Sequence, residues 1–204
     1  QEGAEVVAIL GRSPESVRKS AARLKELTGF DGAVYTDLGV LLREARPDIV
    51  DICTPAPCHA AQALQALQDG RRVLCEKPLV FDPALDEEAL LAQADAVVQL
   101  AQARGRDFGL CSQFSVAART CAELRQARGA LAPRRIALEL RSPVRGRAPN
   151  PAQTWIDLGP HLVAALQTLL PGLEPDWASL RVAAGGHNAE LVFVVPAADG
   201  RSVD

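Results

Sequence analysis

Three side chains that can move protons lie in two distant segments of the sequence. Lys77 follows an apolar run and stands between Glu76 and Pro78. Asp157 and His161 are four residues apart, so on a helix the carboxylate and the imidazole would share one face. Lysine, carboxylate and imidazole groups are typical carriers of general acid–base chemistry. The sequence therefore indicates a proton-transfer site whose parts come from two segments. We expect Lys77 and His161 to converge on one cleft.

The segments before Lys77 follow the pattern of a parallel α/β sheet. Residues 48–53 and 72–75 are apolar and strand-like, and residues 59–68 between them are helix-like. Ligands of open parallel sheets bind outside the carboxyl ends of the strands. Thr54 and Lys77 both fall at such an end, and the proline after the lysine fixes the turn.

Strands and helices alternate through the whole first half. Further strands are expected at 5–10 and 108–111, and further helices at 14–28, 38–45 and 85–104. This alternation predicts an α/β fold with helices on both faces of a parallel sheet, which we assign to residues 1–112.

The regular alternation of strands and helices does not continue in the second half. Helices are expected at 117–128 and 156–170, strands at 135–140, 180–184 and 190–195, and a loop rich in proline and arginine at 141–153. The last two strands have no helix between them and should pair antiparallel. Residues 113–204 are therefore expected to form a smaller α+β domain with a mixed or antiparallel sheet.

Composition argues against several classes of partner. The 204 residues carry a net charge of −3, which gives no electrostatic reason to expect nucleic acid or an anionic membrane. No apolar run approaches the roughly 20 residues that span a bilayer. The five cysteines are an odd number spread through the chain, which favours a reduced, cytoplasmic setting over a disulfide framework.

Together these motifs resemble the Gfo/Idh/MocA family of oxidoreductases, which use NAD or NADP to oxidise or reduce sugars and related polyols. The resemblance rests on three segments of the sequence: Thr54-Pro55 with His59, Glu76-Lys77-Pro78, and Trp155-Ile156-Asp157-Leu158-Gly159-Pro160-His161. It implies that residues 1–112 form a Rossmann-like dinucleotide-binding domain. It also implies that residues 113–204 bind a small sugar-like substrate and join identical chains into a dimer or tetramer.

The resemblance also assigns roles to individual residues. Lys77 would contact both cofactor and substrate, His161 would be the acid/base on the reacting hydroxyl, and Asp157 would position the substrate or tune the imidazole. Trp155 would complete the substrate site. The competing interpretation is a surface lysine paired with Glu76, a capping aspartate and a structurally bonded histidine.

Further residues are expected to contact the cofactor: Arg12, Ser13, Thr54, Pro55, His59, Glu76, Lys77 and Pro78. No acidic residue stands in Gly11-Arg12-Ser13, so NADP is favoured over NAD. Arg12 can equally be a solvated loop residue, Ser13 a helix cap, and His59 a residue that caps or packs locally.

The glycine-rich turn G-x-G-x-x-G of dinucleotide-binding folds is absent from the 204 residues. The strand at 5–10 looks like the family's second, so we expect the natural protein to be longer. An alternative is a non-catalytic binding or scaffolding protein that has lost dinucleotide binding. A third is a dehydratase or epimerase that uses bound cofactor without net redox change.

Two remaining clusters are given structural interpretations. Cys53, Cys58 and Cys75 lie near His59, but small thiols are common in buried strands, and no metal site is expected. Three arginines of the proline-rich loop are interpreted as solvated, with binding of a substrate carboxylate or phosphate as the alternative: Arg141, Arg145 and Arg147.

Overall fold

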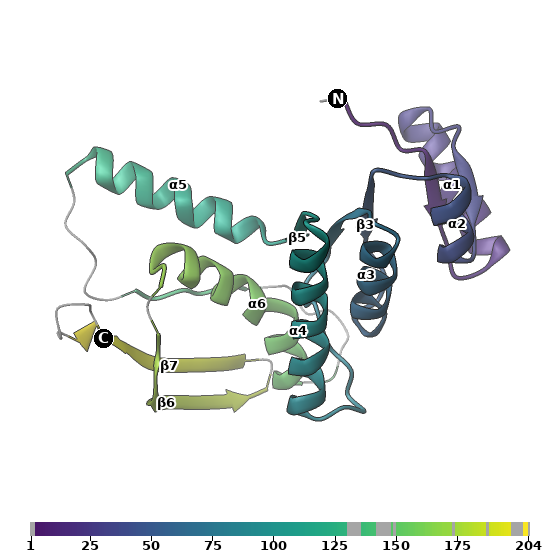
Figure 1. The fold of residues 1–204 in the computed structure, drawn as a ribbon. Coiled ribbons are helices and arrows are strands. Elements are labelled where there is room, and N and C mark those ends of the chain that lie inside the picture. The colour runs from purple at the N-terminus through teal and green to yellow at the C-terminus, as the bar shows by residue number, and fades with distance from the viewer. Residues whose placement is uncertain are drawn as a thin grey trace. The chain divides into compact units, whose positions relative to one another are not determined.

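The computed structural model describes residues 3–129, 136–141, 148, 150–172, 174–186, 188–196 and 202–203. The chain divides into two compact units, Gln1–Cys111 and Ser112–Asp204, which are described one at a time. Figure 1 shows the order of their elements along the chain.

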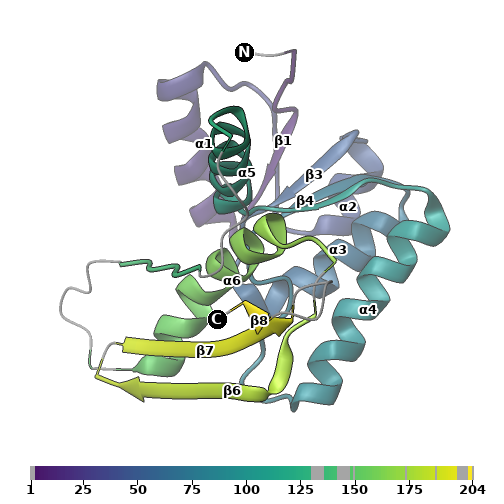
Figure 2. The same ribbon diagram turned by 90° about the vertical axis from the view of Figure 1, so that its left-hand side faces the viewer.

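The first unit contains the predicted parallel strands, arranged in two small sheets. Strand β1 (Ala8–Leu10) pairs in parallel with β2 (Ala33–Tyr35). The other sheet has the order β3 (Ile49–Ile52), β4 (Arg72–Cys75) and β5 (Phe108–Leu110), again all parallel. Figure 2 shows β3 and β4 running side by side. The sequence patterns predict four of these strands and miss β2, a three-residue strand that is mostly exposed.

Local capping fixes where the first helices begin and end. Helix α1 (Pro14–Thr28) begins after Ser13, whose Oγ accepts a hydrogen bond from the Ser16 backbone N–H at 3.2 Å. It ends at Gly29, whose φ of 77° is the left-handed conformation that glycine adopts without strain. Helix α2 (Leu38–Glu44) begins after Asp37, whose carboxylate accepts from the Val40 backbone N–H at 2.8 Å.

Two further helices build the core of the first unit. Helix α3 (His59–Gln68) follows a single 3₁₀ turn, η1 (Ala56–Cys58), and α4 (Glu87–Arg104) begins after Asp86. They pack together, and α3 also packs against β3 and β4. The fully buried centre of this core contains Ala63, Ala66, Leu67, Cys75 and Val97. The small alanines let α3 approach the sheet closely, and burial of the Leu67 side chain alone contributes about 1.5–3 kcal/mol.

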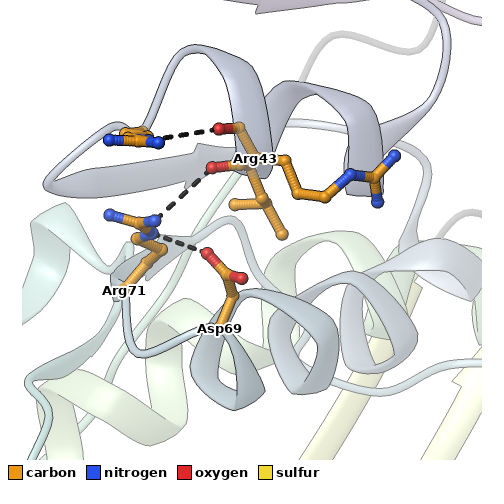
Figure 3. Close-up of polar contacts among 5 residues, drawn as sticks. Arg43, Asp69 and Arg71 are labelled. Atoms are coloured by element: carbon orange, nitrogen blue, oxygen red, sulfur yellow. Dashed lines mark hydrogen bonds and ion pairs between the residues drawn. The ribbon is translucent and has the colours of Figure 1, made fainter.

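Arg71 links α2 to the end of α3. Its Nε donates to the Asp69 carboxylate at 2.8 Å, and its Nη2 donates to the carbonyl oxygen of Leu42 at 3.4 Å. Figure 3 shows this guanidinium between the two helices. Arg71 thereby helps to hold α2 against the segment that joins α3 to β4.

The second unit combines helices with an antiparallel sheet. It comprises α5 (Gln113–Ala127), α6 (Pro151–Leu169), β6 (Asp176–Gly185), β7 (Asn188–Pro196) and β8 (Ser202–Val203). Strand β7 pairs antiparallel with β6, as expected for the last two predicted strands. It also pairs antiparallel with β8, which was not predicted. Helix α6 packs on α5 and on β7. None of the helices in the described ranges is both long and apolar enough to cross a bilayer.

Two predictions for the second unit differ most from the structure. The strand predicted at 135–140 is absent, because residues 136–141 form no regular element and pair with no described strand. An apolar run becomes a strand only where a neighbour can accept its backbone hydrogen bonds. Helix α6 also begins five residues earlier than predicted, because Asn150 caps it: Oδ1 accepts from the Gln153 backbone N–H at 3.0 Å.

Candidate functional site

Two turns leave neighbouring strands at the same edge of the β3-β4-β5 sheet. Ile52 and Cys75 are register partners at the ends of β3 and β4, and the backbone N–H of Glu76 donates to the carbonyl oxygen of Ile52 at 2.9 Å. The chain then continues into Thr54 and Lys77. The structure therefore brings these two predicted residues onto adjacent turns at the carboxyl ends of parallel strands, where such sheets bind ligands.

Helix α3 anchors the turn that follows β3. The Thr54 hydroxyl donates to Oε1 of Gln62 at 2.7 Å. Pro55 is exposed and precedes η1, where its carbonyl oxygen accepts from the Cys58 backbone N–H at 2.9 Å. Gln62 was not among the residues predicted from the sequence. Its position one helical turn after His59, on the same helix face, is the signal that could have identified it.

His59 lies between the two turns and is only 1% exposed. Its Nδ1 is 2.7 Å from the carbonyl oxygen of Pro78, and its Nε2 is 2.6 Å from the carbonyl oxygen of Thr54. Both ring nitrogens are thus engaged by backbone. This geometry matches the local interpretation of His59 more closely than direct contact with a cofactor.

Lys77 is half-buried, as are its neighbours Glu76 and Pro78. The backbone N–H of Lys77 donates to the Glu76 carboxylate at 3.3 Å, and the Lys77–Pro78 peptide is cis. Lys77 is therefore partly enclosed at the end of β4.

Three thiols surround the same strand ends. Burial raises the pKa of Cys75 to about 12, with further contributions from Cys111, Cys53 and nearby carboxylates. The pKa values of Cys53 and Cys111 are also raised, again mainly by burial. All five cysteines are free thiols. In the part of the chain that the structure describes, no group of three or more His, Cys, Asp or Glu side chains could hold a metal ion.

The turn after β1 carries the residues predicted to choose between NAD and NADP. Gly11 is required there, because a Cβ atom would lie 2.6 Å from the Cβ of Val17. The Ser13 hydroxyl serves as the cap of α1, as one of the two sequence interpretations had it. The Arg12 side chain is exposed at the carboxyl end of β1.

The second unit holds the other predicted residues on α6. Asp157 is exposed and His161 is half-buried, and both lie inside the helix, which Asn150 rather than Asp157 caps. The His161 ring lies 4.9 Å from the Phe114 ring of α5, and its Nδ1 is buried. Phe114 is a neighbour that the sequence analysis did not identify.

Trp155 and Gly159 lie one helical turn apart on α6, and the Trp155 ring packs against Gly159. A Cβ atom at Gly159 would lie 2.6 Å from the Trp155 ring, so the ring covers the space that a side chain would occupy. This explains why a buried glycine is placed in the middle of a helix despite its poor helix propensity.

The remaining polar features lie elsewhere. A hollow of about 380 Å³ at the amino ends of β3, β4 and β5 is lined by Asp48, Arg71, Arg72, Arg106 and Asp107, on the edge opposite the candidate site. Arg141 is exposed and its Nε donates to the Glu139 carboxylate at 2.6 Å. Arg145 and Arg147 lie outside the described residues.

Comparisons with known proteins identify similar sequences. Residues 1–110 match the family GFO_IDH_MocA, described as an oxidoreductase family with an NAD-binding Rossmann fold. D-glucoside 3-dehydrogenase of Escherichia coli K12 is 32% identical over 94 residues, which are 46% of this chain and 25% of that protein. Inositol 2-dehydrogenase of Streptomyces avermitilis is 34% identical over 101 residues, 49% of this chain and 28% of that protein.

The similarity to solved structures extends over both units. UDP-N-acetylglucosamine 3-dehydrogenase GnnA from Acidithiobacillus ferrooxidans superposes with a TM-score of 0.69 at 26% identity, covering 97% of this chain and 59% of that one. The α/β fold followed by an antiparallel strand pair is therefore shared with such enzymes. The sequence matches span about a quarter of the length of the curated relatives named above.

Proposed function

This chain belongs to the Gfo/Idh/MocA oxidoreductase family, and on that premise we propose that it is part of an NAD(P)-dependent dehydrogenase. The reaction is hydride transfer between nicotinamide and a hydroxyl-bearing carbon of a sugar, polyol or similar small molecule. The observation that carries the proposal is the pair of adjacent turns, Thr54-Pro55 and Glu76-Lys77-Pro78, at the carboxyl ends of β3 and β4. The relatives named for glucoside and inositol oxidation support the substrate class.

The described residues fit the nicotinamide end of the cofactor. The strand-end turns offer backbone groups and the half-buried Lys77 at the edge where open parallel sheets bind their ligands. The pyrophosphate end needs a glycine-rich turn at a helix N-terminus, and G-x-G-x-x-G does not occur in the sequence. Among the described strands, β1 and β3 each have a hydrogen-bonded neighbour on one side only. A further parallel strand that carries the glycine-rich turn could therefore pair with the other side of either strand.

The chain's own residues provide orientation and proton transfer, while the bound nicotinamide supplies the hydride acceptor. Oxidation removes a hydride from the carbon and a proton from its hydroxyl. In the proposal the proton passes to Nε2 of His161, since Nδ1 is buried. Asp157, one turn earlier on α6, and Trp155 hold the substrate. Lys77 comes from the first unit, and its ammonium group orients the same hydroxyl beside the cofactor.

The finer parts of the proposal concern cofactor choice and assembly. The exposed Arg12 at the end of β1, without an acidic neighbour in that turn, favours NADP over NAD. Exposed apolar side chains on β6 and β7, Trp177, Val182 and Val192, support assembly of identical chains into a dimer or tetramer. Five free thiols suit a reducing, cytoplasmic setting.

The test is cofactor binding and turnover by the full-length protein. We expect NADPH or NADH fluorescence to change on titration, and a panel of sugars and polyols to reveal reduction of NADP⁺ or NAD⁺. The Lys77→Met variant should bind cofactor but turn over far more slowly. Binding of neither cofactor would refute the dehydrogenase.

A second candidate is a non-catalytic binding or scaffolding member of the family. It predicts no dinucleotide binding by the full-length protein but an intact fold. A dehydratase or epimerase would instead bind cofactor tightly and convert substrate without net change in nicotinamide absorbance, and product analysis separates it from the dehydrogenase.

A further inference from the structure

Phe114 packs against the imidazole of His161 within the second unit. Phe114 is the second residue of α5, and His161 lies inside α6. The two ring centroids are 4.9 Å apart and the ring planes are tilted by 46°, which is within the range of favourable aromatic pairs. Both residues are half-buried. The contact therefore joins the proposed acid/base to a side chain on a different helix.

Small residues accompany both rings along their helices. Ala118 follows Phe114 by one turn and is buried, and Ala165 follows His161 by one turn and is also buried. Residues four apart share a helix face, so each ring and its alanine lie on the same side of their helix. Helices α5 and α6 pack against each other. Phe114 is therefore held by the packing between the helices.

The orientation of the imidazole matters because its two nitrogens differ in access. The Nδ1 atom of His161 is buried, so Nε2 is the nitrogen that meets a hydroxyl in the proposed reaction. A half-turn about Cβ–Cγ would exchange the positions of nitrogen and carbon atoms on the ring, and this torsion is broad in histidine. A catalytic group must be held within about 0.5 Å of its productive position by side chains packed around it.

We propose that Phe114 is a positioning residue that holds the His161 ring in the orientation that presents Nε2 to the substrate hydroxyl. Phenylalanine has no group that donates, accepts or transfers a proton, so its effect on proton transfer is exerted through the imidazole. The kinetic consequence rests on the proposed function, whereas the ring contact is a property of the folded chain.

The contact is tested first without cofactor or substrate. In full-length protein labelled with ¹³C and ¹⁵N at histidine and phenylalanine, we expect nuclear Overhauser contacts between the ring protons of Phe114 and His161. The sequence has three histidines, and the His161 signals are assigned by their loss in His161→Gln. Phe114→Leu should shift these signals because the ring current is lost, whereas the control Val116→Ala, at an exposed position of α5, should not. Absence of the contacts in the wild type overturns the proposal.

Kinetics then test positioning. Phe114→Leu should lower kcat about 10- to 100-fold through misplacement of the imidazole, and Phe114→Tyr, which keeps the ring, should retain most of kcat. The KM for cofactor should not change, because the residues proposed at the cofactor are in the first unit. If Phe114→Leu does not fold, Phe114→Met, with a flexible chain of similar volume, replaces it in both measurements.

A double variant distinguishes positioning from a direct role of Phe114. In a His161→Gln background, Phe114→Leu should cause no further loss of kcat, because a residue that acts through the imidazole has nothing left to position. A further loss, or a rise in substrate KM with kcat unchanged, would show that Phe114 contacts the substrate itself and would refute positioning. A wild-type protein that shows the ring contact but no turnover refutes the proposed function and not the contact.

Discussion

The hydroxyl of Thr54 donates a 2.7 Å hydrogen bond to Oε1 of Gln62, so the side chain expected at the cofactor is anchored to α3. Thr54→Val removes the donor and leaves Gln62 Oε1 unsatisfied at a partly buried position. We expect the free energy of unfolding to fall by about 1 kcal/mol in urea titrations. Thr54→Ser keeps the hydroxyl and should retain most of the free energy of unfolding that Thr54→Val loses. Equal urea midpoints for the valine and serine variants would contradict this anchoring role.

Arg12 lies exposed at the end of β1 and is predicted to favour NADP. Arg12→Ala should weaken NADPH binding roughly tenfold or more, because a charge-assisted hydrogen bond contributes about 1.5–3 kcal/mol. NADH binding should hardly change, and fluorescence titration measures both. Arg18→Ala removes an exposed arginine from α1 and serves as the control. Equal losses for the two cofactors would mean that Arg12 does not select between them.

Lys77 and His161 come from different units, and the proposed reaction requires both at one substrate. Lys77→Met and His161→Gln should each lower kcat about 10²- to 10⁴-fold with unchanged circular dichroism. Residues that act as a unit give non-additive losses, so the double variant should be little worse than the slower single variant. Losses that multiply would show that the two residues act independently.

Gly159 accommodates the Trp155 ring, which a Cβ atom would approach to 2.6 Å. Gly159→Ala gains about 1 kcal/mol in helix propensity but should lose about 1–3 kcal/mol to overpacking, so no net stabilisation is expected. The displaced ring should change the tryptophan fluorescence. Gly185→Ala is the control, because nothing lies within 4 Å of its Cβ position. A Gly159→Ala protein with unaltered emission and higher stability would rule out this packing constraint.

Cys75 is fully buried, and burial raises its pKa from 9.0 to about 12. The folded state therefore keeps the thiol proton where the unfolded state loses it. This contribution to stability is complete below about pH 9 and is lost as the pH rises toward 12. Cys75→Ala should show a shallower loss of unfolding free energy across that window than the wild type.

Alkylation gives an independent measure of the same thiol. Native protein treated with iodoacetamide at pH 8 should be modified at the exposed Cys58 and Cys121 and spared at Cys75. Cys53 is also exposed but should react more slowly, because its pKa is raised. All five thiols should react after denaturation. Rapid native modification of Cys75, located by mass spectrometry, would show that the thiol is accessible.

The sequence by itself determined the features that depend on near neighbours. The caps at Ser13 and Asp37, the end of α1 at Gly29 and the strand that places Lys77 all follow from residues a few positions apart. Hydrophobic periodicity and capping are local, so they are readable without coordinates. The family resemblance, now supported by the match over residues 1–110, came from the same kind of short motif.

Only the tertiary structure decided which groups meet across the chain. The contact of His59 with Pro78 joins residues 19 positions apart, and no spacing rule predicts it. The failure of residues 136–141 to form a strand, and the short strand β2, likewise depended on whether a partner strand was in reach. Backbone hydrogen bonds and buried polar contacts need partners that folding brings together. A sequence pattern therefore shows that a residue needs a partner, but it does not identify that partner.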